Sequence, residues 1–205
     1  FNTIYLTGTS TGTGFGNTGI YHTTSATATS GALDMRNNIV YNSSTPTGAG
    51  RAVAYRRSST TLTNFTNASN NNLYYVAAGA NNHIYSDGTN HLGLVAYKAL
   101  GGIAPRETNS QEENVAFQST TGSDAAFLKV STGAPTLVEG GAQPIAGITD
   151  DYFGTIRNGS GPDIGAHEDN FPNIALVITS SSVSPSTIQC TATTHTVTVV
   201  LGLGI

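Results

Sequence analysis

The sequence predicts an all-β protein, organised as a right-handed parallel β-helix with one short helix. The first supporting observation is composition: only 10% of the 205 residues are charged, and 24 are glycine. Threonine, serine and asparagine are also abundant, and such a composition favours short strands and turns over helices. The second observation is an internal repeat, and the third is that polar, glycine-rich turns separate the repeated segments.

Two strand-like patterns each occur three times within the first 85 residues. In one pattern an asparagine and a polar residue precede an apolar run, and its copies begin at Asn2, Asn37 and Asn71. The copies of the other pattern begin at Gly19, Ala52 and His83. Self-similarity with a period of 31 to 35 residues is typical of repeat proteins, in which each unit buries its apolar face against its neighbours.

The tandem asparagines at 37–38 and 71–72 are predicted to be structural. Strands of successive turns would stack about 4.8 Å apart, the spacing of neighbouring strands in a sheet. Asparagine tolerates the left-handed turn conformation, and its amide can hydrogen-bond along a ladder of equivalent side chains. The alternative is a role in ligand binding.

Beyond residue 75 the repeat becomes less regular. Residues 87–90 (Asp-Gly-Thr-Asn) form a strong turn signal. Residues 92–100 are the best helix candidate, because Gly101 and Gly102 follow as a stop signal. The helix is expected to lie over or beside the coil, and residues 111–150 are expected to form the last, irregular turns.

The sequence divides into a parallel β-helix over residues 1–170 and a different segment over 171–205. Residues 174–178 and 189–199 alternate as the strands of a β-sandwich do. They are predicted to begin an immunoglobulin-like module, whose remaining strands would lie further along a longer chain or in another chain, since such a sandwich needs about seven strands.

Charge and cysteine content exclude several classes of partner. Residues 1–75 hold four arginines against Asp34 alone, whereas the net charge of the chain is −4. So few cations cannot form a broad basic patch, and nucleic acid is not an expected partner. Cys190 is the single cysteine and cannot form an internal disulfide. No apolar run reaches the roughly 20 residues that cross a bilayer, so no membrane span is expected.

Catalytic carboxylates are scarce in the repeated region. A polysaccharide lyase needs clustered carboxylates for Ca²⁺ and a basic residue that removes a proton. An inverting hydrolase needs two carboxylates about 6.5–9.5 Å apart. Residues 1–75 offer only Asp34, which is expected to form a surface ion pair with Arg36. The alternatives are that Asp34 and Arg36 act as an acid and a base, or that both contact a ligand.

The best candidate for ligand binding is the run Tyr55-Arg56-Arg57. The two arginines could bind an anionic sugar. Rings on which a sugar stacks are offered by Tyr21, Tyr41, Tyr74, Tyr75 and Tyr85. The alternative is that half of these tyrosines belong to the core and that the arginines are solvated. The five histidines show no metal-ligand spacing; His83 and His91, for example, are eight positions apart.

Acidic residues gather near the end of the predicted β-helix. The candidates for a Ca²⁺ site are Asp150, Asp151, Asp163 and Glu168. Their spacing does not match an EF-hand loop. The alternative is that these residues form turns and that Asp151 or Asp163 pairs with Arg157 and closes the end of the coil. No other cofactor is expected.

The same end of the chain carries a family resemblance. Residues 149–157 and 161–168, which finish on Asp-Ile-Gly-Ala-His-Glu, are similar to the DIGAxE close of secreted parallel β-helix proteins from Bacteroidota, of the pectate-lyase-like superfamily. Further upstream the resembling segments are 37–39, 53–59 and 71–74. The resemblance covers about residues 1–170. It implies a large cell-surface or released protein, commonly exported by the type IX secretion system.

These observations together give two functional expectations. The first is a non-enzymatic extracellular or cell-surface module, structural or adhesive, which binds glycans or forms part of a filament. Its partners would be a polysaccharide or cell-surface glycan, neighbouring domains of the same chain, and further copies joined through open strand edges. The alternative is a carbohydrate-active enzyme of the β-helix class, a polysaccharide lyase or a glycoside hydrolase.

Overall fold

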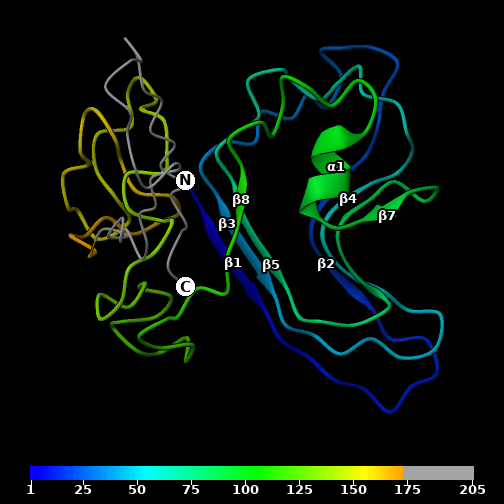
Figure 1. The fold of residues 1–205 in the computed structure, drawn as a ribbon, viewed down its shortest axis with the longest axis horizontal. Coiled ribbons are helices and arrows are strands. Elements are labelled where there is room, and N and C mark those ends of the chain that lie inside the picture. Colours follow the sequence, from blue (N-terminus) through cyan, green and yellow to red (C-terminus); the bar gives the residue numbers. More distant parts are fainter. Residues whose placement is uncertain (173–205) are drawn as a thin grey trace, which may run out of the picture. The chain divides into compact units, whose positions relative to one another are not determined.

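The computed structural model of the chain describes residues 1–172. Residues 1–112 form a parallel β-solenoid of about three turns, which confirms the predicted all-β class (Figure 1). The strands expected at 174–178 and 189–199 lie outside the described residues. Within the described part, no helix is long and apolar enough to cross a membrane.

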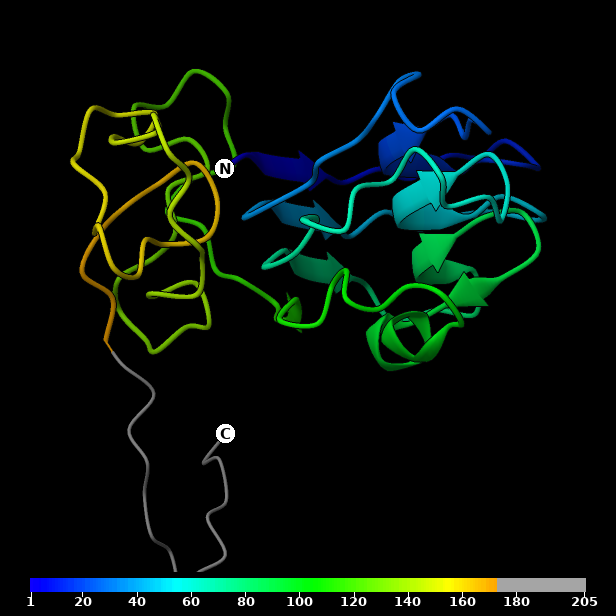
Figure 2. The same ribbon diagram turned by 90° about the horizontal axis from the view of Figure 1, so that it is seen from above.

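Two four-stranded sheets face each other across the coil. The first sheet has the order β1 (Thr3–Leu6), β3 (Ile39–Asn42), β5 (Leu73–Val76) and β8 (Gln111–Glu112). The second sheet has the order β2 (Asn17–His22), β4 (Ala52–Arg57), β6 (Asn82–Ser86) and β7 (His91–Leu92). All pairs are parallel except β6–β7. Figure 2 shows the strands of each sheet stacked as successive turns.

Both predicted repeats correspond to strands, and equivalent positions stand in register. Ile4 pairs with Val40, and Val40 pairs with Tyr74 on the next turn. A shorter third side is marked by the parallel bridge between Leu33 and Phe65. One period of the sequence is therefore one turn of the solenoid.

An asparagine ladder ties the turns together, as predicted. The amide nitrogen of Asn2 donates to Oδ1 of Asn38 (2.9 Å), and that of Asn38 donates to Oδ1 of Asn72 (2.8 Å). The same oxygens also accept the backbone N–H of Asn2 and of Asn38. Ser110 continues the ladder by accepting the N–H of Asn72 through its hydroxyl (2.9 Å). Because Asn38 and Asn72 are buried, these bonds satisfy groups that water cannot reach.

The first asparagine of each tandem pair has a different role. Asn37 and Asn71 adopt left-handed backbone conformations, with φ of 61° and 55°. The Asn37 side chain donates to the carbonyl of Gln143 (2.7 Å) and accepts its N–H (3.0 Å). Asn71 donates to the carbonyl of Gly141 (2.9 Å). These two side chains therefore attach residues 141–143 to the solenoid, although Gln143 follows Asn37 by 106 positions and Gly141 follows Asn71 by 70 positions in the sequence.

Alternation along β3 and β5 separates two hydrophobic cores. Val40 and Tyr74 point into the coil, whereas Ile39 and Leu73 point outward. The inner core is completed by Met35, Ala54, Tyr55, Phe65, Ile84, Tyr85, Leu94, Tyr97 and Ile103. The outer core adds Val115, Val130, Val138, Ala142, Ile164 and Phe171. The first sheet is thus covered on both faces, which explains its short apolar runs.

The predicted helix is present but shorter than expected. α1 spans Leu94–Ala99, and the Tyr97 ring stacks on Tyr85 of β6 with a centroid distance of 4.1 Å. The preceding turn is also confirmed, because the Asp87 carboxylate accepts the backbone N–H groups of Thr89 and Asn90. This turn reverses the chain and makes β7 antiparallel to β6.

Residues 113–172 do not form further regular turns of the solenoid. After β8, the strand pairing within residues 113–172 consists of isolated bridges such as Phe117–Val130 and Ser119–Phe127. The segment lies beside the first sheet (Figure 1) and packs on its outer face through the outer core. Frequent glycines and prolines interrupt its apolar runs, and this prevents strands long enough to continue the ladder.

Glu107 ends the inner polar network and makes stability depend on pH. This fully buried carboxylate accepts hydrogen bonds from Tyr74 (3.1 Å), Asn72 and Ser110. Burial raises the pKa of Glu107 to about 7, although the three hydrogen bonds act in the opposite direction and lower it. An unfolded glutamic acid has a pKa of about 4.3. Between these two values the folded state keeps a proton that the unfolded state releases, so the free energy of unfolding falls as pH rises.

We expect Glu107→Gln to remove this share of the pH dependence. Between about pH 5 and pH 8 the wild-type chain should lose about 2 kcal/mol more stability than the variant, since one pKa unit corresponds to about 1.4 kcal/mol. Urea unfolding of both proteins at the two pH values measures the difference, and other titrating groups cancel in it. Equal losses would show that Glu107 is ionised throughout this range.

Candidate functional site

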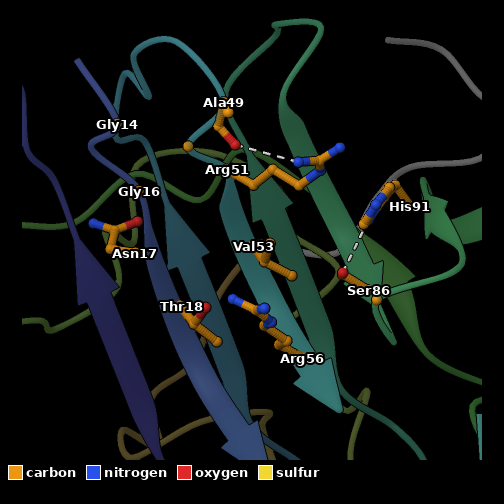
Figure 3. Close-up of a pocket in the computed structure, with 12 residues that line it drawn as sticks. Gly14, Gly16, Asn17, Thr18, Ala49, Arg51, Val53, Arg56, Ser86 and His91 are labelled. Carbon is orange, nitrogen blue, oxygen red and sulfur yellow. Dashed lines mark hydrogen bonds between the residues drawn. The ribbon is translucent and has the colours of Figure 1, made fainter. Parts of the chain in front are cut away.

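The second sheet carries a polar groove on its outer face. Figure 3 shows its lining side chains, and its volume is about 470 Å³. The lining comprises Gly14, Gly16, Asn17, Thr18, Ala49, Gly50, Arg51, Val53, Arg56, Ser86, Gly88 and His91. None of these residues is acidic, so the groove within the described part of the chain is basic.

Strand register aligns three lining residues of the groove, Arg56, Ser86 and His91, with Tyr21 beside it. Tyr21 of β2 stands opposite Arg56 of β4, and Arg56 stands opposite Ser86 of β6. Ser86 in turn pairs with His91 of β7. This four-residue row crosses the whole sheet, over about 14 Å at the usual strand spacing. We call it the cross-strand row.

Glycines form one rim, where two loops stack closely. The loop before β2 and the loop before β4 touch through their backbones. A Cβ atom on Gly50 would lie 1.8 Å from the carbonyl oxygen of Phe15, and one on Gly16 would lie 2.5 Å from the backbone nitrogen of Arg51. Only glycine allows this approach, which fixes Arg51 at the rim.

Two arginines in the groove keep unused hydrogen-bonding capacity. Arg56 is exposed, and its guanidinium carbon lies 6.0 Å from the centre of the Tyr21 ring. Arg51 lines the groove, and its guanidinium donates one hydrogen bond, from Nη1 to the carbonyl of Ala49 (3.3 Å). Neither arginine belongs to an ion pair in that range. Both can therefore bind an anion.

Two histidines stand at one side of the groove. The His91 ring stacks on the His83 ring, with centroids 5.3 Å apart, and Nδ1 of His91 lies 2.9 Å from the Ser86 hydroxyl. Burial lowers the pKa of both rings. Nearby positive charge disfavours protonation and lowers both pKa values further: that of His83 through His91 and then Arg51, and that of His91 through Arg51.

The nearest acid, Asp87, is occupied by the β6–β7 turn. Besides Thr89 and Asn90, it accepts the Tyr85 hydroxyl (3.3 Å). Burial would raise the pKa of Asp87, but the hydrogen bonds from Asn90 and Thr89 outweigh burial and lower it. Asp87 therefore stays ionised near neutral pH, and it is held by the turn rather than by an arginine.

The structure separates the three residues of the predicted Tyr55-Arg56-Arg57 site. Tyr55 and Arg57 are fully buried inside the coil, and only Arg56 is exposed. Arg57 donates to Nδ1 of His22 (2.7 Å) and to the Tyr55 hydroxyl (2.9 Å), and it lies over the Phe65 ring at 5.1 Å. Arg56 is therefore the member of this run that can reach a ligand from solvent.

Asp34 and Arg36 form the predicted surface ion pair. Nε and Nη2 of the arginine bind the two carboxylate oxygens, each at 2.8 Å. Both residues line a separate hollow beside Phe1 and Asn38, so they do not belong to the basic groove.

Three of the four Ca²⁺ candidates, Asp151, Asp163 and Glu168, accept hydrogen bonds from backbone N–H groups. Asp151 accepts N–H groups of Phe153, Thr155 and Glu168, and Asp163 accepts those of Gly140 and Asp169. Asp150 forms an isolated bridge with Ile156. Within residues 1–172, no three histidine, cysteine or acidic side chains are placed to hold a metal ion.

The carboxylate that pairs with Arg157 is Glu168, rather than Asp151 or Asp163 as expected. The two charged groups are 3.0 Å apart and nearly fully buried. Arg157 reaches Asp163 through the backbone carbonyl (3.2 Å). Burial raises the pKa of the Asp163 carboxyl to about 7, and the negative charge of Glu168 adds to this rise.

The sequence did not predict that Arg51, His83 and His91 lie together in one cluster. Arg51 precedes β4 and His91 follows a turn, so no local motif joins them. One signal was present, because the predicted 87–90 turn followed by His91 implies a hairpin that brings His91 back to β6.

Comparison with protein-family models, curated proteins and solved structures finds no match to this chain. The β-solenoid is thus shown by the structure, whereas membership of the secreted Bacteroidota family stays a prediction from the sequence.

Proposed function

We propose that this chain is a non-enzymatic extracellular or cell-surface module that binds acidic glycans through the basic groove. The observation that carries the proposal is the pair Arg51 and Arg56, which line the groove without an ion-pair partner among the described residues. A guanidinium binds a carboxylate or sulfate through two parallel hydrogen bonds and stays charged at physiological pH.

Other residues in and beside the groove favour a sugar chain over a small anion. Tyr21, at one end of the cross-strand row, is 58% exposed and offers a ring face on which a sugar can stack. Thr18, Asn17 and Ser86 add neutral polar groups to the lining. The length of the row suits an extended oligosaccharide. Nucleic acid fits less well, since the chain as a whole is acidic.

The extracellular setting is supported by the family resemblance and by the composition. The chain has few charges and many hydroxyl side chains, and its stacked repeats form a long, regular surface. Such a repeat architecture suits an adhesin as well as a filament subunit, and we propose glycan binding for either role.

We expect the double variant Arg51→Ala/Arg56→Ala to bind acidic glycans at least about tenfold more weakly. Losing a hydrogen bond to a charged group costs about 1.5–3 kcal/mol, and 1.4 kcal/mol corresponds to tenfold in affinity. Calorimetric titration of the 205-residue chain with polygalacturonate and with heparin oligosaccharides measures this. Arg36→Ala is the matched control, because Arg36 lies outside the groove.

Three results would count against the proposal. The first is that the wild-type chain binds neither glycan. The second is that Arg51→Ala/Arg56→Ala and the control Arg36→Ala weaken binding equally, which would indicate diffuse charge attraction. Release of unsaturated or reducing sugar ends by the purified chain would instead support the carbohydrate-active enzyme.

A further inference from the structure

The stacked histidines are placed where a ligand of the groove would change their protonation. His91 lines the groove itself. His83 stands opposite Val53, another lining residue, and its ring stacks on His91. Neither ring has a carboxylate within salt-bridge distance among the described residues. Both imidazoles therefore face a site with a positive charge.

The charged groups around this pair come from β4 and the β6–β7 turn. Arg51 directly precedes β4, Arg56 lies near its end, and Asp87 comes from the turn. α1 also packs against β6 and β7, and the ammonium of its one charged residue, Lys98, donates to the carbonyl of Ser110. Asp87 stays ionised, so the histidines are the groups of this cluster whose usual pKa lies between about pH 5 and pH 8.

We propose that the binding of an acidic glycan is coupled to protonation of His83 and His91, so that the groove binds the glycan more tightly at mildly acidic pH. This coupling rests on the function proposed above. A sulfate or carboxylate that binds Arg51 and Arg56 offsets their positive charge. It also places a negative charge beside the two rings. Each change favours the imidazolium form.

The direction of the pH effect follows from linkage. In the free chain, burial and the neighbouring cations hold the pKa of both histidines below its usual value. The bound anion raises the pKa, so the complex holds more protons than the free protein. Affinity therefore rises as pH falls through the interval between the free and bound values, and it is constant above both.

The test is calorimetric titration of the 205-residue chain with a heparin oligosaccharide at about pH 5.5 and pH 7.5, on either side of the usual histidine pKa, at constant ionic strength. Sulfate stays ionised at both values, so the ligand charge does not change. We expect the Kd to be about threefold or more lower at the acidic pH, since a one-unit rise of one pKa permits up to tenfold. Titrations in buffers of different ionisation enthalpy should show proton uptake.

His83→Gln/His91→Gln should abolish both the pH dependence of the Kd and the proton uptake on binding, whereas Arg36→Ala should keep both. Circular dichroism confirms that each protein is folded at both pH values. Equal affinity at both pH values without proton uptake would overturn the coupling and leave the proposed function standing. A pH effect that survives in the double histidine variant would overturn the assignment to these residues. Absence of binding at both pH values would overturn the proposed function itself.

Discussion

Asn72→Ala should destabilise the chain by about 4 kcal/mol, one of the two largest effects that we expect. The Asn72 amide is completely buried, and its oxygen accepts both the backbone and the side-chain N–H of Asn38. Its nitrogen donates to the carbonyl of Met35 (2.9 Å) and to Glu107 (3.2 Å). Each buried group left without a partner costs about 1–3 kcal/mol. Urea unfolding followed by circular dichroism measures the loss.

Asn2→Ala is the matched control for this effect. Asn2 occupies the exposed end of the same ladder, and its side chain donates a single hydrogen bond, to Asn38. Its loss should cost no more than about 1 kcal/mol, the typical net value of one hydrogen bond. If the two variants were equally stable, the ladder would contribute little, and apolar packing alone would set the register of the turns.

Arg157→Met should destabilise the chain by about 3–5 kcal/mol, the usual cost of breaking a buried ion pair from one side. The change leaves the buried Glu168 carboxylate without its cation. It also removes the donor to the carbonyls of Asp163 (3.2 Å) and Gly165 (2.9 Å). The guanidinium lies 4.0 Å from the Phe1 ring centre, so a favourable cation–aromatic contact disappears as well.

Arg36→Met provides the comparison, because it breaks an arginine–carboxylate pair with similar distances at the surface. The side chains of Arg36 and Asp34 are 30% and 39% exposed, against 4% and 7% for Arg157 and Glu168. A surface pair is worth about 0–1 kcal/mol. The loss of stability measured by thermal and urea unfolding should therefore be clearly larger for Arg157→Met than for Arg36→Met. A similar small loss in both would mean that the 150–170 segment is not coupled to the stability of the solenoid.

The repeat made most of the solenoid predictable from the sequence. Asparagine followed by an apolar run marked β1, β3 and β5, and the second pattern marked β2, β4 and β6. The Asn38–Asn72 ladder followed from the same alignment of turns. These features are local patterns that recur, and recurrence places equivalent residues side by side without knowledge of the rest of the fold.

The groove was less predictable, because it depends on which face each side chain occupies. Alternation separates Arg56 from its neighbours Tyr55 and Arg57, but the residues from Ala52 to Tyr55 are all buried. Sequence alone therefore did not show which face was open. The segment 113–172 was also hard to predict, since its packing depends on contacts with distant residues such as Asn37–Gln143 rather than on a repeat.

The cross-strand row has a consequence for how such a protein could vary. Each turn of the coil adds one position to the row, as Tyr21, Arg56 and Ser86 do on consecutive turns. Inserting or deleting a turn would lengthen or shorten the groove by one strand spacing, about 4.8 Å, while the ladder inside repeats unchanged. The number of turns would then act as a ruler for the length of sugar chain that the surface can accommodate, independently of which sugars it contacts.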